Sequence, residues 1–287
     1  KLKPKKVLFI ATRQIGDVLV TTPLISKART LWPDAEFHFL GYRGKLDMLH
    51  GNPDISEIIE TSDRPSFGEY LSLFIRLFQR YDLAIITQPS DRAYIYGLVS
   101  AFSRVGVLGG HPQGIDVKEV SKRSKAEKQN AWKKFVCMHT VDVDYFKQHV
   151  IAEKLRLLEV FFRNPHEIFD EPISVAPPAG EPLTPSIAGE ITQPYVVIHP
   201  GPLTAYKRWP LAHWQTLITW LVERGYQVIL SASPAKQDVQ LNHDIFSLLD
   251  DETRAKVINA AGTLSIPQAG SLLRGAILYI GVDTDRK

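Results

Sequence analysis

The chain has 287 residues, of which 44% are hydrophobic and 23% charged, and its formal net charge is +3. This balance is typical of a globular protein and excludes disordered and fibrous classes, and so small a positive charge does not indicate a nucleic-acid partner. The length predicts two domains. The single cysteine, Cys137, excludes a disulfide framework or a zinc site of several cysteines within one chain, which fits a reducing compartment.

The sequence contains no apolar run of transmembrane length. The basic residues 1–6 lead directly into a strand-like segment, without the apolar region of a signal peptide. We therefore expect a cytoplasmic protein. A solvated tail is the favoured interpretation of the basic start, and contact with an anionic lipid surface is the alternative.

Apolar runs alternate with helical patterns through the first half of the chain. Residues 7–11, VLFIA, lack polar alternation, as expected for a strand covered on both faces in a parallel sheet. A turn with one glycine follows, and then apolar residues at helical spacing up to Trp32-Pro33-Asp34. Repeated strand-then-helix order predicts a parallel α/β sheet. The predicted strands are 7–11, 36–40, 55–60 and 83–87, and the predicted helices are 18–31 and 70–80.

The pattern weakens over residues 109–146, which we interpret as a loop with a dense basic run at 118–134. A solvated charged surface is one explanation of that run. The other is that Lys118, Lys122 and Arg123 bind a phosphorylated acceptor. Helical spacing returns over residues 149–162, and the proline-rich stretch 165–194 is the expected linker.

The strand and helix alternation then begins again, without obvious sequence identity to the first half. Predicted strands are 195–199, 227–231, 256–260 and 277–282, and predicted helices are 214–224 and 266–274. The expected organisation is an N-terminal domain over 1–164, a linker over 165–194 and a C-terminal domain over 195–287.

Ligands of open parallel sheets lie beyond the carboxyl ends of the strands, so the residues after each strand are the candidates for a site. After the first strand, Gly16 allows a tight turn and close approach of a ligand. Asp17 is either the N-cap of the following helix or a general base aimed into a cleft, and spacing alone favours the cap. The single glycine is a weak dinucleotide signal, because the pattern Gly-x-Gly-x-x-Gly is absent; a nicotinamide dehydrogenase is therefore disfavoured.

Two further turns offer ligands for phosphate. His199-Pro200-Gly201 is followed by Thr204, Lys207 and Arg208, a hydroxyl and two cations placed before a helix. The cations could instead be surface residues near Trp209. After the last strand, Asp283 and Thr284 offer a carboxylate and a hydroxyl, suited to a helix cap or to a ligand.

Taken together, these segments resemble family 9 glycosyltransferases, the bacterial heptosyltransferases that build the inner core of lipopolysaccharide, over nearly the whole chain. The type III enzymes are the nearest within the family. The matching residues are Gln14-Ile15-Gly16-Asp17-Val18-Leu19, Thr21-Thr22-Pro23-Leu24, Trp32-Pro33-Asp34-Ala35, Gly51-Asn52-Pro53, the His149-Val150 helix start, His199-Pro200-Gly201, Lys207-Arg208-Trp209-Pro210, Arg224-Gly225-Tyr226-Gln227-Val228 and Gly281-Val282-Asp283-Thr284.

The resemblance implies two facing Rossmann-like domains of the GT-B type with the active site in the cleft between them. The N-terminal domain would bind a lipopolysaccharide core or lipid A acceptor, with peripheral contact to the cytoplasmic face of the inner membrane, and the C-terminal domain an ADP-heptose donor. Transfer would invert the anomeric centre without a metal or other cofactor. The roles implied are Asp17 as general base, Gly16 with Thr204, Lys207 and Arg208 at the diphosphate, Leu264 beside adenine, and Asp283 with Thr284 at the donor sugar and phosphate.

Two departures from the family pattern qualify these roles. The family places a glutamate for the ribose hydroxyls after the strand that ends here at Ser231, whereas this chain has only Asp238 among residues 233–238 as a carboxylate. The family also continues from its Asp-Thr pair into a helix with a histidine, whereas this sequence stops at Lys287. We therefore expect a truncated C-terminal domain and weak or absent activity of the chain as written. The alternative function is a non-catalytic module that binds the acceptor or a partner.

Overall fold

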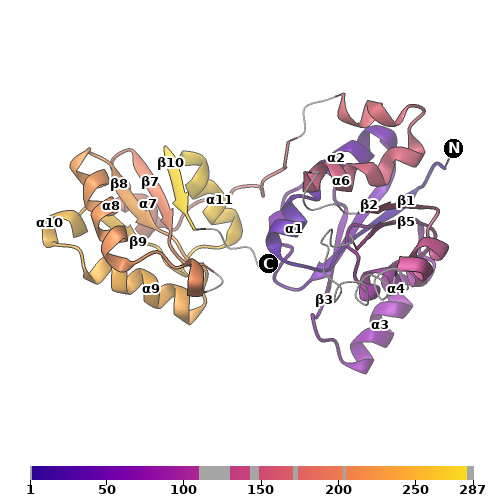
Figure 1. The fold of residues 1–287 in the computed structure, drawn as a ribbon, viewed down its shortest axis with the longest axis horizontal. Helices are drawn as coiled ribbons and strands as arrows, with labels where there is room; N and C mark the ends of the chain where they lie inside the picture. The colour runs from indigo at the N-terminus through magenta and orange to yellow at the C-terminus, as the bar shows by residue number, and fades with distance from the viewer. Residues whose placement is uncertain (1, 110–129, 143–148, 171–173, 203–204, 283–287) are drawn as a thin grey trace, which may run out of the picture. The chain divides into compact units, whose positions relative to one another are not determined.

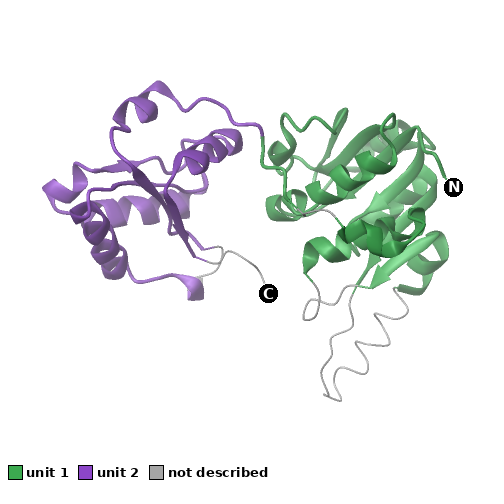
Figure 2. Ribbon diagram, turned by 90° about the horizontal axis from the view of Figure 1, so that it is seen from above, with its two compact units in different colours: residues 1–178 green, residues 179–287 purple. Residues whose placement is uncertain are grey.

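A computed structural model describes residues 2–109, 130–142, 149–170, 174–202 and 205–282. These divide into two compact units, unit 1 from Lys1 to Pro178 and unit 2 from Ala179 to Lys287, each built on one parallel sheet (Figures 1 and 2). The boundary lies inside the stretch 165–194 that was expected to be the linker.

Unit 1 is a six-stranded sheet in the order β3-β2-β1-β4-β5-β6, with every neighbouring pair parallel. In the register, Val7 of β1 lies opposite Phe37 of β2 and Leu83 of β4. This is the strand order of a doubly wound Rossmann sheet. Its elements are β1 Lys6–Ala11, α1 Ile15–Leu19, α2 Thr22–Leu31, β2 Glu36–Tyr42, η1 Asp47–Leu49, β3 Glu57–Thr61, α3 Phe67–Leu77, β4 Tyr81–Ile86, α4 Asp91–Ser100, β5 Ala101–Leu108, β6 His139–Asp142, α6 Val150–Leu155, η2 Arg156–Phe161 and η3 Pro165–Phe169.

The strands of unit 1 bury side chains on both faces, which is why their sequences are apolar without alternation. Phe9 of β1 faces a core formed with α2 and α6, and Leu8 faces a second core formed with α3 and α4. Figure 1 shows these two pairs of helices on opposite sides of the sheet. Helix α3 begins with a capping box in which the Ser66 side chain accepts from the Glu69 amide and the Glu69 carboxylate accepts from the Ser66 amide.

Two predictions for unit 1 were wrong in detail. The helix expected over 18–31 is two helices, and α2 starts with Pro23 in its first turn, where the missing amide hydrogen costs no helical bond. The loop expected over 109–146 contains a helical segment at 130–136 and the sixth strand, β6, of which only Val141 is fully buried. A four-residue edge strand with one buried side chain leaves no recognisable apolar run.

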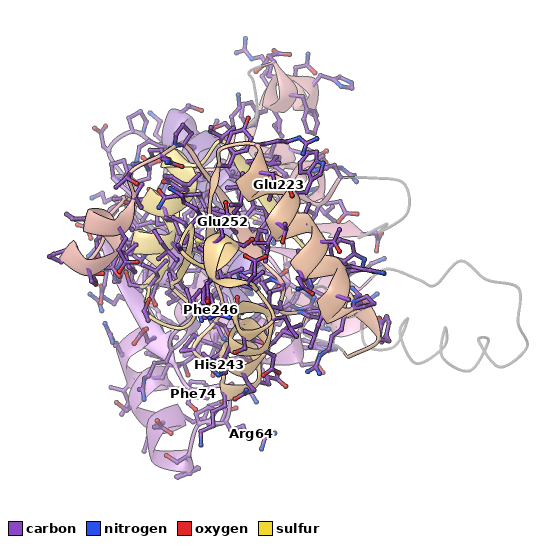
Figure 3. The ribbon with its side chains drawn as sticks, turned by 90° about the vertical axis from the view of Figure 1, so that its left-hand side faces the viewer. Arg64, Phe74, Glu223, His243, Phe246 and Glu252 are labelled. Atoms are coloured by element: carbon purple, nitrogen blue, oxygen red, sulfur yellow. The ribbon has the colours of Figure 1, made fainter. Side chains whose placement is uncertain are left out.

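Unit 2 is a four-stranded parallel sheet in the order β10-β7-β8-β9. Val196 and Ile198 pack against α8 through Trp214 and Ile218, whereas Val197 packs on the other face with Leu272 of α11. Helix α9 carries His243 and Phe246, which are labelled in Figure 3. The elements are α7 Pro185–Glu190, β7 Tyr195–His199, η4 Ala205–Lys207, α8 Leu211–Glu223, β8 Gln227–Leu230, α9 Lys236–Ser247, α10 Asp251–Arg254, β9 Val257–Asn259, α11 Ile266–Gly275 and β10 Leu278–Gly281.

The expected linker divides between the two units. Ile168 of η3 belongs to the core of unit 1, and the amide of Ala176 donates to Thr22 Oγ1 at 2.8 Å. A few residues later, Glu181 accepts from Ser265 Oγ at 3.1 Å, and Ile187 of α7 packs in the core of unit 2. The segment that joins the two units is therefore much shorter than the proline-rich stretch.

Candidate functional site

The order of the strands places the candidate site of unit 1 between β1 and β4. In a doubly wound sheet the chain runs in opposite directions from these two central strands, and a crevice opens at their carboxyl ends. The loop after β1 contains residues 12–17, and the loop after β4 contains residues 87–90. The two loops meet, since Thr12 Oγ1 lies 3.5 Å from Ser90 Oγ and Thr87 Oγ1 donates to the Ile10 carbonyl at 2.9 Å.

Asp17 lies at this crevice, half-buried, in the first turn of α1. The N-cap of α1 is Gln14, whose side chain makes no capping hydrogen bond, so the interpretation of Asp17 as the helix cap is wrong. The Asp17 amide donates to the Gln14 carbonyl at 3.0 Å, and its own carbonyl accepts from Thr21 Oγ1 at 2.7 Å. The backbone at Asp17 is thus fixed by local bonds, and the carboxylate is not engaged in capping the helix.

The turn at Gly16 does not need a glycine, although the space beside this residue is open. Its φ is not positive, so the turn does not require a glycine's conformational freedom. A Cβ added there would meet no atom within 4 Å, and the residue is exposed. The open space beside Gly16 lies next to Asp17 in the chain, which leaves room for a ligand to approach the loop.

Lys154 is a functional candidate that the sequence did not reveal. It lies on α6, is only 4% exposed, and its Nζ donates to the Thr87 carbonyl at 3.2 Å. Burial lowers the pKa of Lys154 to about 8; Asp17 and Glu153 oppose that shift, and Arg13 adds to it. The one sequence signal was a lysine on the apolar side of a predicted helix, three residues after Ile151.

A second lysine, Lys133, is buried against the same loop. It is also 4% exposed, and its Nζ lies 2.5 Å from the Pro89 carbonyl and 2.7 Å from Asp91 Oδ1. Gln88 lies between Thr87 and Pro89, the two residues whose carbonyls accept from the buried lysines. It is 2% exposed, and its side-chain oxygen and nitrogen have no hydrogen-bond partner among the described residues. The carboxyl end of β4 is therefore surrounded by buried polar groups.

In unit 2 the corresponding crevice lies at the carboxyl ends of β7 and β10. Burial lowers the pKa of His199, the last residue of β7, and the nearby Asp238 carboxylate opposes that shift. A Cβ on Gly201 would lie 3.1 Å from Asp238 Oδ1, so the glycine allows close approach of this carboxylate. Asp238 also accepts from Ser233 Oγ at 2.5 Å. These contacts place the Asp238 carboxylate beside the turn that follows β7.

The expected phosphate cations follow the same strand. Lys207 is the last residue of η4 and is half-buried, and Arg208 after it is exposed. The Trp209 ring packs edge-on against Trp214, with 4.7 Å between ring centroids, and this contact anchors the segment to α8. Both cations thus lie on the short segment between β7 and α8.

Leu264 lies between β9 and α11 and is partly buried against the core of unit 2. Of the other expected site residues, Thr204, Asp283 and Thr284 lie outside the described residues, as do Lys118, Lys122 and Arg123.

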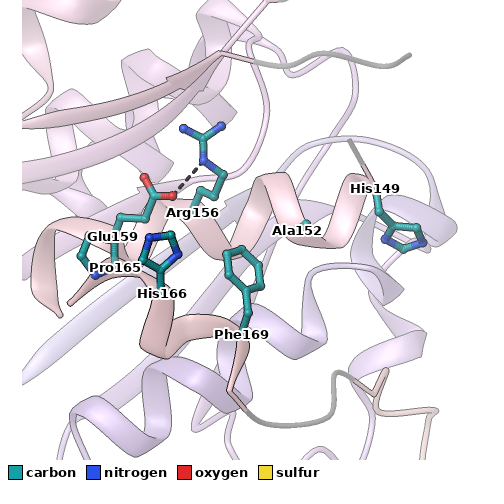
Figure 4. A pocket seen from close by; sticks show the side chains of 7 residues that line it. All are labelled: His149, Ala152, Arg156, Glu159, Pro165, His166 and Phe169. Atoms are coloured by element: carbon teal, nitrogen blue, oxygen red, sulfur yellow. Dashed lines mark hydrogen bonds and ion pairs between the residues drawn. The ribbon is translucent and has the colours of Figure 1, made fainter. Parts of the chain in front are cut away.

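A cavity of about 410 Å³ lies on the outer side of α6 in unit 1 (Figure 4). Within it, Arg156 Nε donates to Glu159 Oε1 at 2.8 Å. The lining contains none of the residues that the sequence singled out for the site. It is formed by His149, Ala152, Arg156, Glu159, Pro165, His166 and Phe169.

In the part of the chain that the structure describes, no three or more His, Cys, Asp or Glu side chains gather in a group that could hold a metal ion. Among the same residues, no helix combines the length and apolarity needed to cross a bilayer.

The profile described as "Glycosyltransferase family 9 (heptosyltransferase)" matches residues 74–285. The chain belongs to glycosyltransferase family 9. This match includes the loop after β4, Lys154 and the Lys207-Arg208 segment, whereas Asp17 precedes it. The resemblance inferred from the sequence motifs is thereby confirmed.

Individual relatives agree with the family assignment. This family 9 transferase is 28% identical over 280 residues to lipopolysaccharide heptosyltransferase 3 of Escherichia coli K12, a match that covers 95% of this chain and 75% of that protein. The E. coli ADP-heptose lipopolysaccharide heptosyltransferase II structure is 20% identical, with a TM-score of 0.71, over 97% of this chain and 79% of that one. The structure of E. coli heptosyltransferase WaaC with ADP is 17% identical, with a TM-score of 0.67, over 97% of this chain and 82% of that one. The predicted GT-B class, with two Rossmann-like domains, is confirmed.

Proposed function

We propose that this transferase moves a heptose from ADP-heptose to an inner-core acceptor of lipopolysaccharide, with inversion at the anomeric carbon and Asp17 as general base. The observation that carries the proposal is the half-buried carboxylate of Asp17, freed from capping, at the crevice between β1 and β4. The names of the relatives support the substrates, since they include an ADP-heptose enzyme and a lipopolysaccharide heptosyltransferase 3.

The proposed reaction is a direct displacement. The acceptor hydroxyl gives its proton to the Asp17 carboxylate while its oxygen bonds to the anomeric carbon. The bond from that carbon to the diphosphate oxygen breaks, and its electron pair stays on the departing ADP. Attack on the face opposite the leaving group inverts the configuration. Lys207 and Arg208 stabilise the negative charge that develops on the diphosphate.

The acceptor side belongs to unit 1 and the donor side to unit 2. In unit 2, Asp238 supports the donor role, because a carboxylate beside the β7 turn can accept from sugar hydroxyls. Leu264 offers an apolar contact for the base. Thr204, Asp283 and Thr284 are proposed to complete the diphosphate and sugar contacts.

Helix α3 supports a peripheral contact with the membrane that holds a lipid-linked acceptor. Leu73 and Leu77 bury one face of α3 in unit 1, whereas Phe67, Leu71 and Ile75, four residues apart, are exposed on another. Phe67 is 84% exposed and Ile75 is 72% exposed, and Phe78, the residue that caps the end of the helix, is exposed as well. An exposed helical stripe of this kind is typical of an interfacial helix.

Charge makes an anionic bilayer the occupant we propose for this stripe. The exposed arginines Arg64, Arg76 and Arg80 lie just before, on and just after α3, and Figure 3 labels Arg64. Arg76 and Arg80 also pair with Glu57, at 2.5 and 3.3 Å, so Arg64 is the arginine of the three with no ion pair among the described residues. Basic residues beside an apolar stripe add electrostatic attraction to anionic lipids. The helix follows β3, so its first turn lies toward the sheet edge that carries Asp17.

The test is transfer itself, measured with the full-length protein, ADP-heptose and a heptose-deficient lipopolysaccharide acceptor. Mass spectrometry of the acceptor should show the addition of one heptose, and NMR of the new linkage should show the configuration opposite to that of the donor. Release of ADP without a glycosylated acceptor, or a product with retained configuration, would rule out the proposed reaction.

A further inference from the structure

Gln88 is a buried residue whose side chain lacks the contacts that burial ordinarily requires. It is 2% exposed, and neither the oxygen nor the nitrogen of its amide has a hydrogen-bond partner in the described part of the chain. Burying an amide without such partners costs free energy, and native proteins keep few groups of this kind. The arrangement therefore needs an explanation other than the stability of unit 1.

Gln227 shows what a structural buried glutamine looks like in the same chain. It is 5% exposed, at the start of β8, and both ends of its amide are engaged. Its Oε1 accepts from the amides of Thr192 and Gln193 at 2.9 and 3.0 Å, and its Nε2 donates to the Glu190 carbonyl at 2.9 Å. Gln227 thus joins the end of α7 to the sheet of unit 2, whereas the Gln88 amide makes no such bond within the described ranges.

The backbone on both sides of Gln88 is held in place. Lys154 Nζ, from α6, donates to the Thr87 carbonyl at 3.2 Å, and Lys133 Nζ donates to the Pro89 carbonyl at 2.5 Å. Both lysines are 4% exposed, and burying an ammonium is costly. Two buried ammonium groups therefore fix the loop on which the unpaired amide lies, and such support suits a binding residue better than a packing residue.

This loop forms one side of the crevice that carries Asp17. Ser90 Oγ lies 3.5 Å from Thr12 Oγ1 on the loop after β1, and Thr87 Oγ1 donates to a carbonyl of β1 at 2.9 Å. Gln88 lies between these two contacts, at the carboxyl end of β4, where ligands of open parallel sheets bind. A ligand that enters the crevice beside Asp17 therefore lies next to this loop.

The chemistry of the amide indicates the kind of ligand. A side-chain amide combines a hydrogen-bond acceptor with two donors on one planar group. Two hydroxyls on neighbouring ring carbons of a sugar match it, since one hydroxyl donates to the oxygen while the other accepts from the nitrogen. An ionised phosphate or carboxylate offers acceptors only and would leave the amide oxygen of Gln88 unpaired. The amide therefore fits a pair of sugar hydroxyls.

We propose that Gln88 binds two neighbouring hydroxyls of the acceptor sugar and holds that sugar beside Asp17. This inference rests on the proposed function and assigns an acceptor contact to unit 1. The amide is enclosed in the free protein, so its side chain turns toward the crevice when the acceptor enters, while the backbone anchored by Lys133 and Lys154 keeps its place. The new hydrogen bonds then satisfy the amide groups that are otherwise unpaired.

The test compares Gln88→Met with the wild-type protein, both at full length, in acceptor binding and in unfolding. The probe is the deacylated core oligosaccharide of a heptose-deficient lipopolysaccharide, measured by calorimetry without donor. Gln88→Met should weaken its binding by about tenfold or more, as expected for two lost hydrogen bonds. The same substitution should raise the urea midpoint of unit 1, followed by alkylation of Cys137, because methionine removes an unpaired buried amide.

Gln227→Met is the matched control, because it removes a similarly buried amide whose bonds are made within unit 2. It should lower the urea midpoint followed by tryptophan fluorescence and leave binding of the oligosaccharide unchanged. In transfer assays, Gln88→Met should raise KM for the acceptor more than it lowers kcat, since the Asp17 carboxylate is intact.

Three results would overturn the proposal in different ways. Unchanged oligosaccharide binding in Gln88→Met would remove Gln88 from the acceptor site and leave the proposed transfer in place. A lower urea midpoint of unit 1 in Gln88→Met would mean that the amide is already satisfied in the free protein, as by a bound water, and that its role is structural. Failure of the wild-type protein to bind the oligosaccharide would refute the proposed acceptor itself, and this inference with it.

Discussion

Lys154→Met is expected to stabilise unit 1 near neutral pH. A pKa lowered from 10.5 to about 8 means that the charged lysine is held in the folded state at a cost of about 3 kcal/mol, at 1.36 kcal/mol per pKa unit. Methionine has a similar shape and no charge to bury. It loses the hydrogen bond to the Thr87 carbonyl, worth about 1 kcal/mol. The expected net gain in the free energy of unfolding is about 2 kcal/mol.

The sign of this effect should depend on pH. Below pH 8 Lys154 is protonated in both folded and unfolded states, so its full cost is present and methionine gains the most. Between about pH 8 and 10.5 the folded state releases the proton while the unfolded chain keeps it, so the wild-type protein becomes more stable as the pH rises. The gain in the free energy of unfolding from Lys154→Met should therefore shrink as the pH rises from about 8 to 10.5. Near pH 10.5 the variant should be slightly less stable than the wild-type protein.

Cys137 provides an assay that reports on unit 1 alone. It is the only cysteine, and burial raises the pKa of its thiol to about 11, so the folded thiol reacts slowly with an alkylating reagent. The fraction labelled across a urea series, at neutral pH and again near pH 10, gives the unfolding transition of unit 1 for both proteins. A Lys154→Met protein that is less stable than wild type at neutral pH, by an amount that does not change with pH, would refute the reasoning.

Three further predictions concern the donor, the membrane and the fold. Lys207→Ala should weaken ADP binding in calorimetry by about 10- to 100-fold, as expected for a lost charge-assisted hydrogen bond, and unchanged affinity would remove Lys207 from the site. Ile75→Glu should lower co-sedimentation with phosphatidylglycerol vesicles by at least about tenfold. Leu248→Glu, which changes an exposed apolar position of unit 2, should leave co-sedimentation unchanged. Equal binding of the wild-type protein and both variants would exclude the α3 stripe as the contact. Gly262→Ala should lower the free energy of unfolding by about 1–3 kcal/mol, because the φ of Gly262 is +72° and the new Cβ would lie 2.8 Å from Val239 Cγ2. Urea unfolding followed by tryptophan fluorescence measures this loss. Gly189→Ala in α7, where a Cβ meets open space, is the control, and equal effects of the two substitutions would contradict the strain argument.

The main strands were predictable because a parallel strand buried on both faces is a short, continuous apolar run, as in residues 195–199. Strands β5 and β6 were not, since Ser103 and Arg104 interrupt the apolar residues of β5, and Val141 is the one fully buried side chain of the four-residue edge strand β6. Helix α9 was missed for a related reason, because its buried face includes a polar residue, Asn242, beside Ile245. Hydrophobic periodicity identifies a helix or strand by its apolar face. A helix or strand whose buried face is short or partly polar therefore gives no clear periodic pattern in the sequence.

The candidate site was partly predictable for the same physical reason. Strand order placed Asp17 and Lys207 at carboxyl ends, where ligands bind in parallel sheets. Spacing could not decide whether Asp17 capped its helix, because the start of α1 at Ile15 depends on local bonds around Gln14. Lys154 was not identified from its place on the apolar side of a predicted helix, since a lysine within a helix is ordinarily solvated. Its burial arises from contact with a loop 67 residues earlier in the chain.

The central claim is that Asp17 removes the acceptor proton, and single-turnover transfer by Asp17→Asn tests it most directly. Asparagine keeps the size of the side chain and cannot accept the proton as a carboxylate does, so the transfer rate should fall by about 10²- to 10⁴-fold. The free energy of unfolding should change by less than about 0.5 kcal/mol, because the side chain caps no helix. A transfer rate within a few-fold of wild type, in a folded protein that binds both substrates, would contradict the account.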